Sequence, residues 1–183
     1  PAVEDGHVLA PDPKQDGFFL LLASPGPALE AEELGEKDVV FALDTSGSMA
    51  GAKLEQARKA LRFCIENLND GDRFEIIRFS TEAEGLFGAL KPADKANRRQ
   101  AAGFVDGLKP MGGTAIDEAL QKALGARAAD ATRPFVVIFL TDGQPTIGET
   151  SEDAIVKKLE KANTAATRVF CFGIGTDLNT HLL

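Results

Sequence analysis

Residues 39–48 read Val-Val-Phe-Ala-Leu-Asp-Thr-Ser-Gly-Ser, so five apolar residues run directly into short oxygen-bearing side chains at alternate positions. An uninterrupted apolar run predicts a strand that is buried on both faces, as in a parallel sheet covered by helices. Ligands of open α/β sheets bind just beyond the carboxyl ends of the strands. Asp44, Ser46 and Ser48 therefore form the pattern of half a binding site for a hard metal ion.

The same residues allow a second interpretation. Asp and Ser are preferred helix caps, and Gly47 suits a tight turn, so this segment alone equally favours a cap for the helix that begins near Lys53. The metal hypothesis depends on further ligands at the ends of neighbouring strands.

Strands and helices alternate along the chain. Apolar residues at helical spacing predict helices over residues 53–67, 95–108, 116–124 and 151–162, the last with Ser151 as its cap. Apolar runs predict strands over residues 17–23, 39–43, 74–79, 86–90, 135–140 and 169–172. Too few residues separate 74–79 from 86–90 for a crossover helix, which predicts an antiparallel hairpin. The fold class is α/β: a three-layer, doubly wound (Rossmann-like), mostly parallel sheet with one antiparallel edge strand and helices on both faces.

A second carboxylate follows the other fully apolar strand. Phe135 to Leu140 runs into Thr141-Asp142-Gly143. If the chain winds one way after the first strand and the other way after this one, the two strand ends flank the switch-point crevice of the sheet. Asp44 and Asp142 would then face each other and repel, unless a cation lies between them.

Thr114 supplies a further hydroxyl, after two glycines that let the backbone approach closely. On its own, Gly112-Gly113-Thr114 favours a plain loop and helix cap. Oxygen-only ligands suit Mg²⁺, Ca²⁺ or Mn²⁺ better than Zn²⁺. If Ser46, Ser48 and Thr114 coordinate directly while the two carboxylates act through waters or hydrogen bonds, the metal stays electrophilic and can accept an external carboxylate.

Composition indicates a folded domain of ordinary polarity. The chain has 183 residues, 44% of them hydrophobic and 26% charged, and a net charge of -8 that argues against sequence-independent nucleic-acid binding. Its apolar runs are too short to cross a bilayer as helices. Because it begins with Pro1 and stops in what reads as a young helix over 180–183, we expect a piece of a longer protein. Cys64 and Cys171 are expected to be buried free thiols rather than a disulfide or a reactive pair.

The pattern Asp44-x-Ser46-x-Ser48, Thr114 and Asp142 resembles the metal-ion-dependent adhesion site (MIDAS) of von Willebrand factor type A domains, over about residues 38–175. Residues 38–41, 71–74, 79–81 and 112–114 are similar to the inter-alpha-trypsin inhibitor heavy chains and their bacterial relatives. The resemblance implies that residues 37–183 form a type A domain that stops before its last helix and strand. Residues 1–36 would then be a strand and an acidic connector, either the end of a preceding domain or an addition to this sheet.

The resemblance also implies a function. One divalent cation, Mg²⁺ first with Ca²⁺ or Mn²⁺ as alternatives, would be bound by these five residues and would hold an Asp or Glu side chain of a protein partner. We expect no catalysis, no nucleic-acid partner and no membrane insertion by this segment. The resemblance favours a secreted, cell-surface or periplasmic location within a longer protein, with a cytoplasmic location left open.

Two alternatives compete with the adhesion hypothesis. The metal could serve only to stabilise the domain. Asp44 also resembles the nucleophile of Mg²⁺-dependent aspartate phosphatases, but Ser46 stands where those enzymes usually carry a second acid, and we find no convincing lysine motif. The sequence contains no phosphate-binding loop, no complete dinucleotide fingerprint and no ordered Ser-His-Asp triad.

Overall fold

A computed structural model describes residues 35–128, 133–165, 167–176 and 178–182. The strand expected over 17–23 and nearly all of the acidic connector lie outside the described residues. The proposed boundary between residues 36 and 37 therefore stays a prediction.

The elements alternate as the sequence predicts, and nearly all of them lie within a few residues of their expected positions. The strands are β1 (Asp38–Asp44), β2 (Arg73–Phe79), β3 (Ala83–Gly85), β4 (Lys91–Pro92), β5 (Phe135–Thr141) and β6 (Arg168–Gly173). The helices are α1 (Ala52–Glu66), α2 (Lys95–Gly107), α3 (Ile116–Gly125) and α4 (Glu152–Ala162), with one 3₁₀ turn, η2 (Gly47–Met49). None of the described helices is both long enough and apolar enough to span a membrane.

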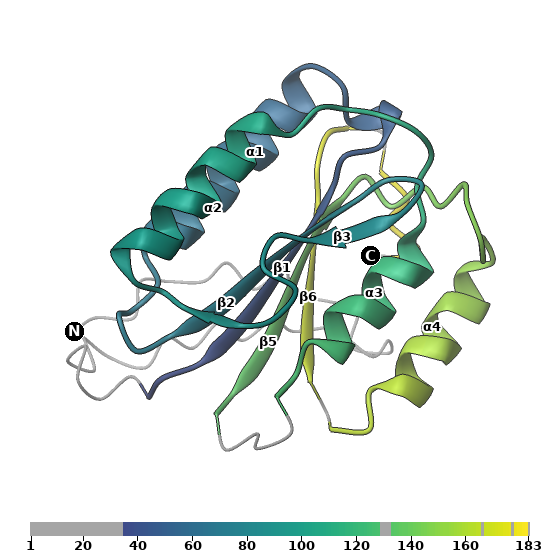
Figure 1. The fold of residues 1–183 in the computed structure, drawn as a ribbon. Coiled ribbons are helices and arrows are strands. Elements are labelled where there is room, and N and C mark those ends of the chain that lie inside the picture. Colours follow the sequence, from purple (N-terminus) through teal and green to yellow (C-terminus); the bar gives the residue numbers. More distant parts are fainter. Residues whose placement is uncertain (1–34, 129–132, 166, 177, 183) are drawn as a thin grey trace, which may run out of the picture. The chain divides into compact units, whose positions relative to one another are not determined.

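The sheet has the doubly wound order β3-β2-β1-β5-β6. Strand β1 lies at its centre and pairs in parallel with both β2 and β5, and β5 pairs in parallel with β6. Strands β3 and β4 both run antiparallel to β2. Helices α1 and α2 lie together over one face of the sheet, and α3 and α4 over the other (Figure 1). The predicted fold class is confirmed.

The two cores explain why β1 is apolar from Val39 to Leu43. Val39, Phe41 and Leu43 pack into the core beneath α1 and α2, whereas Val40 and Ala42 pack into the core on the opposite face. All seven residues of β1 are buried. Alternate residues of a strand point to opposite faces, so a strand covered on both sides needs apolar residues throughout.

The hairpin is real, but its second strand lies earlier than predicted. Ser80 N–H donates to Glu82 O at 3.1 Å, and β3 begins at Ala83 rather than at Leu86. The buried carboxylate of Glu75 accepts the Phe87 N–H at 3.0 Å. The Phe87 amide therefore donates to a side chain and not to the backbone of a neighbouring strand. The prediction of a strand over 86–90 was wrong because its apolar residues pack as an irregular loop.

Three smaller predictions also need correction. Cys64 is only half-buried and Cys171 is exposed, although both are free thiols. Ser151 occupies the N-cap of α4 as expected, but its hydroxyl makes no capping hydrogen bond within the described residues. Residues 180–182 form a turn and not the start of a helix.

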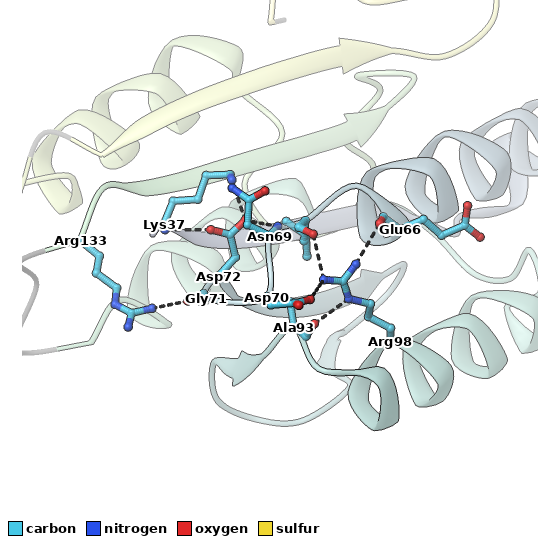
Figure 2. A network of polar contacts seen from close by, with 10 residues as sticks. Lys37, Glu66, Asn69, Asp70, Gly71, Asp72, Ala93, Arg98 and Arg133 are labelled. Carbon is cyan, nitrogen blue, oxygen red and sulfur yellow. Dashed lines mark hydrogen bonds and ion pairs between the residues drawn. The ribbon is translucent and has the colours of Figure 1, made fainter. Parts of the chain in front are cut away.

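Figure 2 shows a polar network around Asp72. It lies at the amino-terminal end of β1 and β2, and Asp44 is at the other end of β1. The fully buried carboxylate of Asp72 accepts hydrogen bonds from Lys37 N at 3.0 Å, Lys37 Nζ at 2.6 Å and Asn69 N at 2.8 Å. From α2, Arg98 donates to Glu66 O at the end of α1. The Asp72 bonds therefore join the residues just before β1 to those just before β2, and the Arg98 bond joins α2 to α1.

Candidate metal centre

The sheet brings the two predicted acids to one edge. Strands β1 and β5 are hydrogen-bonded neighbours, in a register that pairs Leu43 with Leu140. Asp44 ends β1, and Asp142 follows β5. Both carboxylates are completely buried, and they are close enough for their charges to interact. We refer to Asp44, Ser46, Ser48, Thr114 and Asp142 as the candidate metal centre.

Protein donors orient both carboxylate oxygens of Asp44. Its Oδ1 accepts the backbone N–H of Ser46 at 2.8 Å, and its Oδ2 accepts the hydroxyl of Thr141 at 2.6 Å. The Thr141 hydroxyl in turn accepts the N–H of Gly143 at 3.0 Å. Thr141 therefore connects the end of β5 to the carboxylate at the end of β1, a role that the sequence analysis did not assign.

Burial raises the pKa of Asp44 above its ordinary value. Hydrogen bonds from Thr141 and Ser46 act in the opposite direction, and the charge of Asp142 adds to the increase. Loss of solvation disfavours the ionised form, and a nearby like charge disfavours it further. A cation beside Asp44 would reverse this preference, so the electrostatics of the pocket favour a positively charged ligand.

Ser46 and Ser48 point their hydroxyls toward each other. Their Oγ atoms are 3.0 Å apart, with Ser46 buried and Ser48 exposed. The capping interpretation fails for α1, because the N-cap of that helix is Gly51, with a φ of 74°. Ser46 precedes the 3₁₀ turn η2, but its side chain makes no capping bond in the part of the chain described. Ser46 thus occupies the N-cap position of η2, but among the described residues neither η2 nor α1 receives a capping hydrogen bond from a side chain at its N-cap.

The loop that carries Thr114 is bonded to the loop that carries the serines. Gly47 N–H donates to Gly112 O at 3.1 Å, and Met111 N–H donates to Thr45 O at 2.8 Å. Gly112 has a φ of 68°, a conformation that glycine adopts without strain. Thr114 is buried but is not a helix cap, because the N-cap of α3 is Ala115. The segment is a loop, as the alternative interpretation expected, but Thr114 does not cap α3.

A second loop supports Thr114 from the other side. The Thr114 N–H donates to the Thr146 hydroxyl at 2.8 Å, and Thr114 O accepts the backbone N–H groups of Thr146 and Ile147. A side chain at position 113 would meet this loop, because a Cβ there would lie 2.6 Å from Ile147 Cγ1. Gly113 thus allows the loop after β5 to pack against the loop before α3.

Lys53 contacts the candidate metal centre, although its sequence position indicates only the start of a helix. Its Nζ lies 3.1 Å from Asp142 Oδ2, and the other oxygen, Oδ1, accepts the Gln144 N–H at 3.4 Å. A positive charge in the first turn of a helix is opposed by the helix dipole. A lysine at that position could have been recognised as a residue that needs an anionic partner.

The donor chemistry of the centre fits a hard cation. It combines two carboxylates with three hydroxyl groups, and it contains no nitrogen or sulfur side-chain ligand. Within residues 35–128, 133–165, 167–176 and 178–182 there is no group of three or more His, Cys, Asp or Glu side chains that could hold a metal. A metal here would therefore depend on hydroxyl ligands, as Mg²⁺, Ca²⁺ and Mn²⁺ allow.

The two buried acids should respond differently to neutralisation in chelator. Asp44→Asn removes a buried charge whose pKa is raised by burial and keeps one acceptor oxygen, so we expect the Tm at pH 7 to increase. Asp142→Asn leaves the Lys53 ammonium without its carboxylate, so the Tm should fall. Thermal melts in EDTA provide the measurement.

The pH dependence gives the control. Because the folded-state pKa of Asp44 is raised, its ionisation destabilises the fold as pH rises through that pKa. The advantage of Asp44→Asn should therefore shrink in more acidic buffer, where the wild-type carboxyl is protonated. A lower Tm for Asp44→Asn at pH 7 would contradict this account of the pocket.

Comparison with known proteins places this chain in a family. A family model described as von Willebrand factor type A domain matches residues 37–183. Inter-alpha-trypsin inhibitor heavy chain H4 of Homo sapiens is 35% identical over 172 residues, which cover 90% of this chain but only 18% of that protein. The chain thus spans about a fifth of the length of this relative.

Solved structures agree with the sequence relatives. A von Willebrand factor type A structure from Catenulispora acidiphila superposes with a TM-score of 0.73 and 28% identity, covering 81% of this chain and 35% of that one. Proximal thread matrix protein 1 from the mussel byssus, solved with a zinc-occupied MIDAS motif, gives a TM-score of 0.65 and 26% identity, covering 81% and 38%. The chain belongs to the von Willebrand factor type A domain family.

Proposed function

We propose that this chain is a divalent-metal-dependent protein-binding module that captures an Asp or Glu side chain of a partner at the candidate metal centre. The observation that carries the proposal is the convergence of Asp44 and Asp142, two fully buried carboxylates, beside the paired hydroxyls of Ser46 and Ser48. Burying two like charges together is costly, and within the described residues Lys53 offsets the charge of Asp142 only. Family membership agrees with a protein-binding role, and the metal dependence is our inference.

The neutral hydroxyls explain why a bound metal would recruit a partner. Both oxygens of Asp44 are occupied by donors from Ser46 and Thr141, and Asp142 is paired with Lys53. Because protein donors already bind the two carboxylates, these acids would contact the metal through water or hydrogen bonds. Ser46, Ser48 and Thr114 would then be the direct ligands. A cation held mainly by hydroxyls keeps most of its charge, which supplies the attraction for an external carboxylate.

The exposed side of the centre supports partner access. Ser48 is exposed, and so is Met111 on the adjoining loop, with 55% of its surface accessible. Apolar and flexible methionines are common at protein-binding surfaces. We propose no catalytic role, and we place the domain in a secreted, cell-surface or periplasmic protein.

The metal itself is proposed to be Mg²⁺, with Ca²⁺ or Mn²⁺ as alternatives. The donor set is entirely oxygen, which favours these ions. The mussel protein nevertheless has zinc in its MIDAS, so zinc belongs in the panel of ions to be compared.

Metal binding should stabilise the folded domain. At a free Mg²⁺ concentration about 100 times Kd, preferential binding to the folded state contributes about 2.7 kcal/mol. That corresponds to a Tm increase of roughly 5–10 °C over the value in EDTA. Ser48→Ala should lose most of this increase with little change in EDTA, because Ser48 is exposed.

Ser151→Ala is the matched control for this melt. Ser151 is also exposed, and its hydroxyl makes no capping bond within the described residues, so the variant should keep the full increase. Identical wild-type melts with and without each metal of the panel would contradict the proposed metal site.

Partner binding should require both the metal and an acidic side chain. Peptide pairs that differ only by Glu against Gln can be immobilised and tested with fluorescent domain. We expect Glu-dependent retention in Mg²⁺ that is lost in EDTA and in Thr114→Ala. Retention that ignores the Glu-to-Gln change in a metal-stabilised domain would favour the purely structural role of the metal instead.

A further inference from the structure

We propose that Lys53 is an internal competitor for the candidate metal centre, whose ammonium group neutralises Asp142 and thereby lowers and sets the affinity for the divalent cation. The inference rests on the proposed function, since it assigns a regulator to the same site. It concerns a residue outside the Asp-Ser-Ser-Thr-Asp pattern.

The ion pair lies at the boundary between protein and solvent. Lys53 Nζ is 3.1 Å from Asp142 Oδ2, and the Lys53 side chain is 23% exposed whereas that of Asp142 is completely buried. The charge pair is therefore shielded on one side only. Shielding strengthens the attraction relative to a surface pair, and partial exposure leaves the lysine room to move away.

Gly175 provides the path by which Lys53 reaches the acid. A Cβ at position 175 would lie 2.6 Å from Lys53 Cε, 3.3 Å from Cδ and 3.4 Å from Cγ, so the lysine methylenes lie directly on this glycine. Gly175 also has a φ of 105°, which residues with a side chain rarely adopt. The segment after β6 is thus shaped to let a side chain from α1 cross to the end of β5.

Two described residues near Gly175 are bonded to the end of β5 and to the residue that follows it. Ile174 N–H donates to Thr141 O, and Asn179 N–H donates to Asp142 O, each at 3.0 Å. Lys53 therefore crosses a surface whose backbone is bonded to the same residues that carry the acid. The backbone around Gly175 therefore supports the contact between Lys53 and Asp142.

Lys53 should have opposite effects on the two forms of the protein. Without a divalent cation, it supplies the counter-charge that a buried Asp142 needs. With one, the ammonium competes for the same carboxylate and repels the incoming positive charge. Removing the lysine charge should therefore destabilise the metal-free domain and strengthen metal binding, whereas a residue that only supports the site would weaken both.

Lys53→Met tests this directly, because methionine keeps much of the apolar stem and removes the charge. By titration calorimetry, we expect the Kd for Mg²⁺ to fall about three- to tenfold, the range for a partly buried charge pair. In EDTA the Tm should fall by roughly 2–4 °C. Lys59→Met removes the same charge from an exposed position of α1 and should change neither quantity.

Gly175→Ala is a second way to separate the Lys53 ammonium from Asp142. The added methyl group displaces the flexible end of Lys53 without removing its charge. It should also lower the Kd for Mg²⁺, although the strained φ adds a separate loss of stability. Because both changes act through one contact, the double variant Lys53→Met/Gly175→Ala should bind Mg²⁺ no more tightly than Lys53→Met alone.

The outcomes separate this inference from the proposed function. If wild type gives neither heat nor a Tm increase with any divalent metal, the proposed function fails and this inference fails with it. If wild type binds Mg²⁺ but Lys53→Met binds it equally or more weakly, only the role of Lys53 is overturned.

Discussion

The structure depends on one electrostatic constraint: Asp44 and Asp142 are both fully buried at the same edge of the sheet. The pairing of β1 with β5 forces this arrangement, because parallel neighbours end side by side. A different set of contacts offsets the desolvation cost of each carboxylate. Asp44 takes hydrogen bonds from Ser46 and Thr141, and Asp142 takes the ammonium of Lys53. A divalent cation would satisfy both at once, which is why we interpret the edge as a metal centre.

The rest of the fold keeps that edge rigid. Alternate residues of β1 are anchored in two separate apolar cores, so the strand cannot slide without exposing them. The network around Asp72 fixes the opposite ends of β1 and β2 (Figure 2). At the end that carries Asp44 and Asp142, backbone bonds join the loop of Ser46 to the loop before Thr114, and that loop to the one containing Thr146. Such rigidity suits the proposed metal centre, whose residues come from three separate segments.

The spacing of apolar residues along the chain predicted the buried strands and the helices, because that spacing determines which residues an element can bury. The unbroken apolar runs that became β1 and β5 identified the central strands and placed Asp44 and Asp142 together. The apolar residues around Leu86 misled because the buried carboxylate of Glu75, which binds the Phe87 amide, has no sequence signature as a strand breaker. The contact of Lys53 with Asp142 has no local sequence signature, because the two residues are 89 positions apart and the path of the lysine depends on the conformation of Gly175. Contacts of that kind arise from tertiary structure and not from periodicity.

The most direct test of the metal centre is an anomalous diffraction map from crystals of the domain grown with Mn²⁺ and acetate. The account predicts one strong manganese peak at the carboxyl end of β1 and β5, about 2.0–2.4 Å from the hydroxyls of Ser46, Ser48 and Thr114, with an acetate oxygen completing the coordination. A fully occupied peak elsewhere on the domain, with Asp44 and Asp142 still bound only by protein donors, would contradict it.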